Sequence, residues 1–149
     1  MSLKLVKADD YAIRAMIHLA CMPEGSMAMR SEIASAQRIP ASFMAKILRH
    51  LVKAQLLTSA RGVNGGFALA RPAAEITMLQ IVEAIEGPLH IAACVPDQRG
   101  CEWARDCPAS LVWGRVQDAV TEILQETTLE SLVSMPRRDG RVVELHAVG

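Results

Sequence analysis

The stretch "LLTSARGVNGGFALA", residues 56–70, most constrains how this chain folds. Two short strand-like runs, residues 56–60 and 66–70, are joined by the segment "RGVNG". The pair Asn64 and Gly65 strongly indicates a hairpin, because both residue types accept positive φ at low cost. The sequence therefore predicts a two-stranded β-hairpin near the middle of the chain.

Three helical patterns precede this hairpin. Apolar residues recur at helical spacing over residues 10–21, and Pro23 and Gly25 end that helix. A short helix is expected over residues 29–37 and a third over residues 40–54, with Pro40 in the first turn, where its missing N–H costs nothing. Helix, short helix, turn, helix and hairpin is the order of a winged helix-turn-helix domain. The third helix has an apolar face of Met44, Ile47, Leu48 and Leu51, opposite a polar and basic face of Ser42, Ala45, Lys46, Arg49 and Lys53.

Fewer helices and strands are predicted for the second half of the chain. A short helix is expected over residues 78–86, a loop of about twenty residues follows, and a long amphipathic helix covers residues 109–125. That helix carries so much apolar surface that it needs a partner, and a second copy of the chain is the simplest one. A short turn at residues 128–133 precedes a polar tail from residue 134, which is expected to be mobile.

These patterns define the predicted organisation. The fold class is mainly α with a small β-hairpin, a winged helix-turn-helix domain plus a long dimerisation helix. Residues 1–72 form the DNA-binding domain, and residues 73–108 form a connecting helix and a cysteine-rich loop. Residues 109–133 form the dimerisation helix and terminal turn, and residues 134–149 form the tail.

Charge is divided unevenly between the two halves. Residues 1–71 hold ten Lys and Arg against four Asp and Glu, whereas residues 72–149 hold six against twelve. This division is typical of a polyanion-binding part joined to a control or assembly part, although two unevenly solvated faces would produce it as well. The chain shows neither an apolar signal region nor a run long enough to span a bilayer, so we expect a cytoplasmic protein without membrane partners.

Three of the four cysteines lie in "CVPDQRGCEWARDC", residues 94–107. A reducing cytosol disfavours a stable disulfide, and the spacing lacks the close pairs of zinc sites and of thioredoxin-like sites. Wider spacing allows three thiolates from one loop to surround an iron–sulfur cluster, while three idle thiols are the alternative. No catalytic constellation accompanies them, so the chain is not expected to be an enzyme. The candidate ligands are Cys94, Cys101 and Cys107.

The chain resembles the Rrf2 family of bacterial transcription regulators up to about residue 134. The resemblance rests on "DYAIRAMIHLA", "EIASAQRIPASFMAKILRHLVKAQLL", "RGVNGGFALAR", the clustered cysteines and "TLESLV". It implies double-stranded operator DNA as a partner, with the third helix in the major groove and the hairpin as a wing on the minor groove. The residues implied to meet DNA are Ser42, Phe43, Lys46, Arg49, Arg61, Asn64, Gly65 and Gly66.

The resemblance also implies a [2Fe–2S] or [4Fe–4S] cluster in members that carry such cysteines. One branch supplies a histidine three residues after the last cysteine, where this chain has Ser110. Another branch uses an aspartate of the first helix from the partner subunit, which Asp10 matches. Asp10 is therefore the favoured fourth ligand, with His90 or an exogenous molecule as alternatives.

Three functions follow from these features. The first is a homodimeric regulator whose operator binding is switched by an iron–sulfur cluster. The second is a cluster-free regulator switched by thiol oxidation or by a partner protein. The third is a small electron-transfer protein whose basic half docks an acidic partner.

Overall fold

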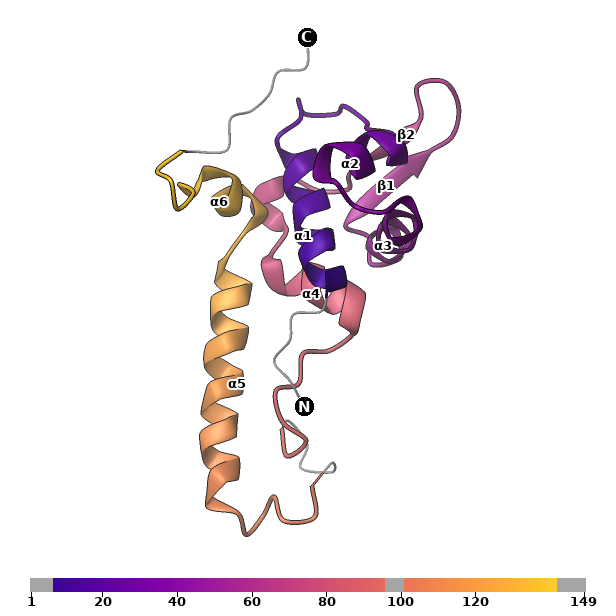
Figure 1. The fold of residues 1–149 in the computed structure, drawn as a ribbon. Helices are drawn as coiled ribbons and strands as arrows, with labels where there is room; N and C mark the ends of the chain where they lie inside the picture. The colour runs from indigo at the N-terminus through magenta and orange to yellow at the C-terminus, as the bar shows by residue number, and fades with distance from the viewer. Residues whose placement is uncertain (1–6, 96–100, 142–149) are drawn as a thin grey trace.

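A computed structural model describes residues 7–95 and 101–141, and Figure 1 shows the arrangement of their elements. In chain order these elements are α1 (Lys7–Ala20), α2 (Arg30–Gln37), α3 (Ala41–Lys53), β1 (Leu57–Ala60), β2 (Gly66–Leu69), the 3-10 helix η1 (Ala73–Glu75), α4 (Met78–Glu86), α5 (Pro108–Glu126) and α6 (Leu129–Ser134). The predicted class, mainly α with one antiparallel hairpin, is confirmed. None of the helices among the described residues has both the length and the apolarity to cross a membrane.

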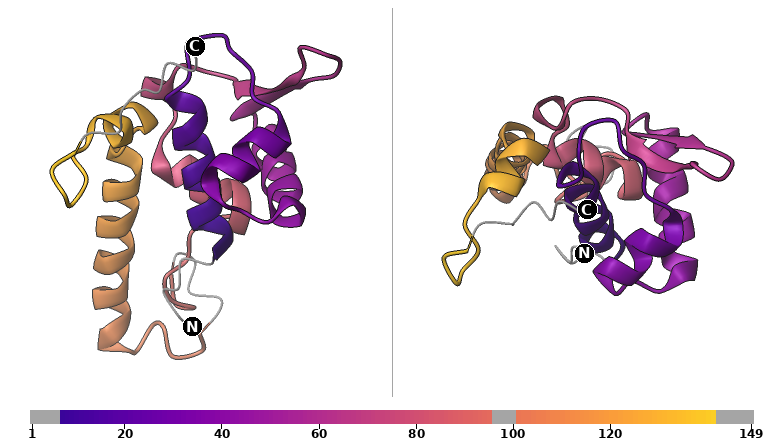
Figure 2. Two further views of the ribbon diagram at one scale, coloured as in Figure 1. Left: turned by 45° about the horizontal axis from the view of Figure 1, so that its top comes forward. Right: turned by 90° about the horizontal axis from the view of Figure 1, so that it is seen from above.

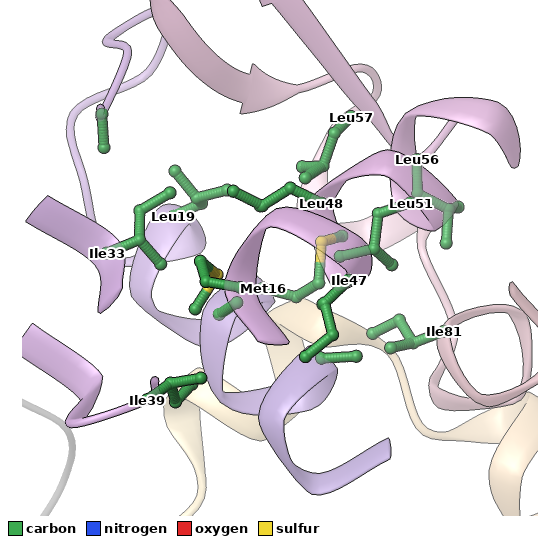
Figure 3. Packing of buried hydrophobic residues seen from close by; sticks show 14 of the residues in the cluster. Met16, Leu19, Ile33, Ile39, Ile47, Leu48, Leu51, Leu56, Leu57 and Ile81 are labelled. Atoms are coloured by element: carbon green, nitrogen blue, oxygen red, sulfur yellow. The ribbon is translucent and has the colours of Figure 1, made fainter. Parts of the chain in front are cut away.

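Helix α1 lies at the centre of the molecule and contacts α2, α3, α4 and α6. Its buried side of Met16 and Leu19 meets the apolar face of α3, where Leu48 and Leu51 are almost fully buried (Figure 3). This single cluster continues into Leu57 of β1. After the DNA-binding and regulatory roles predicted for them, we call residues 7–72 the reading head and the described residues 73–95 and 101–141 the control half.

The turn between α2 and α3 is set by backbone chemistry. Arg38 ends α2 in the left-handed conformation, at φ 53°, and the Ile39 N–H donates to the Ala34 carbonyl at 2.9 Å. A left-handed residue is a common end of an α-helix, because the N–H groups that follow can then satisfy the last free carbonyls of the helix. The sequence pattern placed Pro40 in the first turn of α3. In the structure it is the N-cap residue, one position before that turn.

The hairpin is anchored to the rest of the head. Leu57 pairs with Leu69 and Ala60 with Gly66, and Phe67 exchanges two backbone hydrogen bonds with Ala28. The wing therefore pairs with the segment before α2 as well as with itself. Both views in Figure 2 show the loop between the strands projecting away from the body of the molecule.

Within the control half, the segment before α4 and the segment between α5 and α6 meet at a short seam, and the half packs on the head through α4 and α6, which contact α1, and through the contact of α4 with α3. The Met78 N–H donates to the Thr127 carbonyl, and the Leu129 N–H donates to the Ile76 carbonyl, both at 2.8 Å. Helix α5 extends from this seam and packs mainly against α4, and none of its residues is buried.

One expectation for this half was wrong. The short turn predicted at residues 128–133 is a helix, α6 (Leu129–Ser134), whose N-terminus is capped by the Thr128 hydroxyl. A 3-10 helix, η1, also lies in the segment that the sequence pattern left without structure. The tail predicted from residue 134 is described as far as Arg141, and residues 142–149 lie outside the described residues.

Candidate nucleic-acid interface and cysteine loop

The outward face of α3 is polar and basic. Its inward residues are buried as the spacing predicts, which leaves Ser42, Lys46 and Arg49 exposed on the opposite side. The described part of α3 has no acidic residue in its first turn. A helix with this face can approach a polyanion without repulsion, and side chains of these types contact phosphates and base edges.

Phe43 differs from its neighbours on this helix. Its ring is 48% exposed and meets the Tyr11 ring edge-on, with centroids 6.0 Å apart. The Arg14 guanidinium lies 5.7 Å from the centre of the same Tyr11 ring. Phe43 therefore joins the start of α3 to α1, and its predicted contact with DNA remains a prediction.

The wing presents Arg61 and Asn64 to solvent, whereas its two glycines serve the hairpin itself. A Cβ on Gly66, at φ 145°, would lie 2.5 Å from the Ala28 carbonyl oxygen. A Cβ on Gly65 would overlap the Ala60 carbonyl. Glycine is thus required where the wing packs on the protein's own backbone, and the predicted approach of these glycines to DNA remains a prediction.

The three loop cysteines are free thiols of intermediate exposure. Residues 96–100 of this loop lie outside the described residues. Within the described ranges, no three His, Cys, Asp or Glu side chains are gathered as a metal site. The donor set nevertheless fits an iron–sulfur cluster chemically, because soft thiolates are its usual ligands and none of these sulfurs is held in a disulfide.

Ser110 has a local structural role. Both its N–H and its hydroxyl donate to the Cys107 carbonyl, at 3.0 and 2.8 Å, where α5 begins. His90 is exposed on the segment that follows α4. Cys21, outside the loop, follows α1, and partial burial raises the pKa of its thiol while Arg137 opposes this shift.

Asp10 lies in the first turn of α1, where negative charge is favoured. Its side chain is 62% exposed and forms an ion pair of 3.4 Å with Arg14, one turn along the helix. Arg14 also donates to the Gln37 carbonyl, at the end of α2. No sequence motif pointed to Arg14, although its spacing from Asp10 is that of a helical ion pair.

The fold and this interface define a winged helix-turn-helix, DNA-binding protein. The sequence profile of the Rrf2 family, described as an iron-dependent transcriptional regulator, matches residues 5–135. The chain belongs to the Rrf2 family of transcription regulators.

Individual relatives agree with this assignment. An HTH-type transcriptional regulator of Mycobacterium tuberculosis is 36% identical over 123 residues, which cover 80% of this chain and 74% of that protein. The structure of CymR, the global cysteine regulator of B. subtilis, superposes with a TM-score of 0.72 and 30% identity, covering 88% of this chain and 96% of that one. The structure of T. potens IscR has a TM-score of 0.74 and 25% identity, covering 95% and 94%.

Proposed function

We propose that this Rrf2-family regulator is a homodimer whose operator binding is switched by an iron–sulfur cluster held by Cys94, Cys101 and Cys107 of one subunit and by Asp10 of the partner subunit. The observation that carries the proposal is the presence of three free thiols in one loop of a chain whose reading head exposes a basic helix and a wing. When bound, the cluster supplies a group that responds to oxidants and to small iron ligands.

On the DNA side, α3 occupies the major groove. Lys46 and Arg49 lie three residues apart on its exposed face, so that both reach the same stretch of duplex. Ser42 precedes Lys46 by one turn and is placed to reach a base edge. Arg61 opens the wing loop and is attracted by a narrow, A·T-rich minor groove.

The dimer is formed through α5. Val112, Val116, Ala119 and Ile123 follow one another at helical spacing, and Val112 and Ile123 are 58% and 64% exposed. A stripe of this kind on a helix without buried residues is covered when two copies pack together. We call these four residues the α5 stripe.

The switch acts through α1. Arg14 connects the Asp10 carboxylate to the Gln37 carbonyl, directly before the turn that leads into α3. Tyr11 and Phe43 form a second link between α1 and the start of α3. A change at Asp10 therefore alters how α1 supports α3, and with it the spacing of the two recognition helices in the dimer.

The test begins with protein purified without oxygen. We expect iron, sulfide and visible absorption in the wild type and in Cys21→Ala, whose thiol lies outside the loop. The variant in which Cys94, Cys101 and Cys107 are all Ala should lack all three signals. DNA selected from random duplexes should bind the loaded and cluster-free forms with affinities that differ by about tenfold. Wild-type protein without iron or sulfide, together with unaltered regulation in the triple variant, contradicts the cluster switch.

A second candidate is a cluster-free regulator switched by thiol oxidation. It is supported by the free, partly exposed thiols and by the similarity to CymR, which is named as a cysteine regulator. It predicts that mild oxidant changes DNA affinity in iron-free protein and that reductant restores it. The electron-transfer function has less support, because the family consists of transcription regulators.

A further inference from the structure

An apolar side chain stands at the tip of the wing. Val63 is 99% exposed, and among the described residues no other large hydrophobic side chain has so high an exposed fraction. It is flanked by the exposed Arg61 and Asn64. The Gly65 N–H donates to the Gly62 carbonyl at 3.0 Å, which closes a four-residue turn with Val63 and Asn64 at its corners.

The position of this tip is fixed relative to α3. The Leu56 N–H donates to the Leu51 carbonyl, and the Ala70 N–H donates to the Leu56 carbonyl, both at 3.0 Å, so both ends of the hairpin are tied to the end of the helix. Phe67 and Gly66 fit closely against Ala28 on the other side. When α3 enters a groove, the tip is thus carried to a defined place on the duplex.

The chemistry of the tip matches the minor groove. Proteins that bind there combine a cation or amide side chain with an apolar side chain directed at the base pairs. Arg61, Asn64 and Val63 provide these types within four residues. A β-branched valine has few rotamers to lose when it becomes buried.

We propose that Val63 enters the minor groove and selects A·T over G·C base pairs there. This inference rests on the proposed DNA-binding role of the wing. In the minor groove, A·T pairs present acceptors alone, whereas guanine adds its N2 amino donor. The isopropyl group of Val63 has no acceptor, so it would strip water from that amino group without replacing the hydrogen bond. Val63 therefore disfavours G·C pairs because of their amino group, and it forms no hydrogen bond with a particular base.

The test uses a duplex selected by wild-type protein from random DNA, in which single adenines are replaced by 2,6-diaminopurine. This base leaves the major groove of an A·T pair unchanged and adds the N2 amino group. At the pairs beneath the wing, wild-type affinity should fall about tenfold. Exchanging such a pair for G·C should weaken binding similarly, and inosine·C, which lacks the amino group, should restore it.

The matched variant is Val63→Thr. It keeps the shape of the side chain and adds a hydroxyl that accepts from the amino group, so the diaminopurine effect should shrink to about twofold or less. Val133→Thr, the same change on α6, should retain the tenfold effect. Absence of sequence-preferring binding by the wild type overturns the proposed function itself. Normal binding without a diaminopurine effect, or with an effect that Val63→Thr leaves unchanged, overturns this inference alone.

Discussion

The reading head and the part of the control half around α5 are packed differently, although Ile76, Ile81 and Leu129 of the control half belong to the same core as the head. In the head, every helix contributes fully buried apolar side chains, and the residues proposed to meet DNA lie outside this core. In the control half, the 19 residues of α5 include none that is buried, and Leu111 is 76% exposed. The cysteine loop beside α5 has neither helix nor strand among its described residues.

The two regions become ordered in different ways. Burial within one chain stabilises the head, so the head can present Lys46 and Arg61 in fixed positions. Helix α5 and the cysteine loop leave apolar surface and thiols available to a second chain and to a cluster, whose binding would supply the missing order. Such a division suits the proposed switch, because the segments proposed to bind the cluster and the second chain are less tightly packed than the head.

The sharpest test of this division uses one substitution in both halves. Leu48→Ala removes a side chain that is 1% exposed, and we expect the free energy of unfolding to fall by roughly 2–5 kcal/mol. Leu111→Ala should change it by less than about 0.5 kcal/mol. Denaturant unfolding at fixed protein concentration measures both values. Similar losses in the two variants would mean that α3 and α5 are packed alike.

The next largest effect concerns the α5 stripe. Ile123→Asp places a carboxylate where the proposed dimer is apolar, and we expect association to weaken by more than about 2 kcal/mol. Sedimentation equilibrium measures this change, while circular dichroism should show intact helices. Glu122→Gln, at the neighbouring exposed position, should leave association unchanged. A fully dimeric Ile123→Asp protein would exclude this face as the interface.

On the head, Lys46→Ala tests the basic face. It should weaken binding to the selected duplex about tenfold, or about 1.4 kcal/mol. It should also reduce the slope of log K against log salt by about 1 if the ammonium meets a phosphate. Arg115→Ala, which removes an exposed charge from α5, should change neither quantity. An unaltered salt slope in Lys46→Ala would remove this residue from the phosphate contacts.

The sequence predicted the head better than the control half, for a physical reason. The period of Met44, Ile47, Leu48 and Leu51 fixes which face of α3 is buried, and all four are buried. The segment around Asn64 and Gly65 likewise placed the hairpin, but the reason given for it was wrong, because the positive φ angles fall at Gly62 and Gly66. Both signals act between residues that are close in sequence, where one chain carries the whole pattern.

Other features depend on contacts that no short pattern contains. Gly66 is needed because Ala28, far away in sequence, lies against it. Arg14 gains its role from the Gln37 carbonyl, which only the packing of α2 on α1 brings near. For the same reason, spacing alone could propose Cys94, Cys101 and Cys107 as ligands without showing how they assemble.

A smaller effect is expected at the seam within the control half, where α4 begins. The Thr77 hydroxyl accepts from the Gln80 N–H at 3.3 Å, and the Gln80 side chain accepts from the Thr77 N–H at 3.0 Å. Thr77→Ala removes the first of these bonds and should cost about 1 kcal/mol of unfolding free energy. Thr77→Ser keeps the hydroxyl and should retain most of this unfolding free energy. Equal stability of Thr77→Ala and wild type would show that the seam does not need this cap.

The smallest expected effect is a pH dependence of the head. Burial lowers the pKa of His18 from its ordinary value of 6.5, and Glu32 partly opposes this shift. The Gln37 amide lies 3.4 Å from His18 Nδ1 and can donate to the neutral ring, a bond that protonation removes. The unfolded chain therefore takes up this proton more readily than the folded one. The stability linked to neutral His18 is complete above pH 6.5 and declines as the pH falls below it.

Two variants isolate this effect from general acid destabilisation. His18→Gln does not titrate at this position. The unfolding free energy that it lacks relative to wild type should therefore become smaller as the pH is lowered from 7.5 to 5.5, as measured by denaturant unfolding. Glu32→Gln keeps an oxygen for the Met29 N–H, which Glu32 accepts at 2.6 Å, but removes the charge that favours protonated His18. It should therefore lose more stability than wild type over the same range. If both variants follow the wild-type curve in parallel, His18 does not couple the stability of the head to pH.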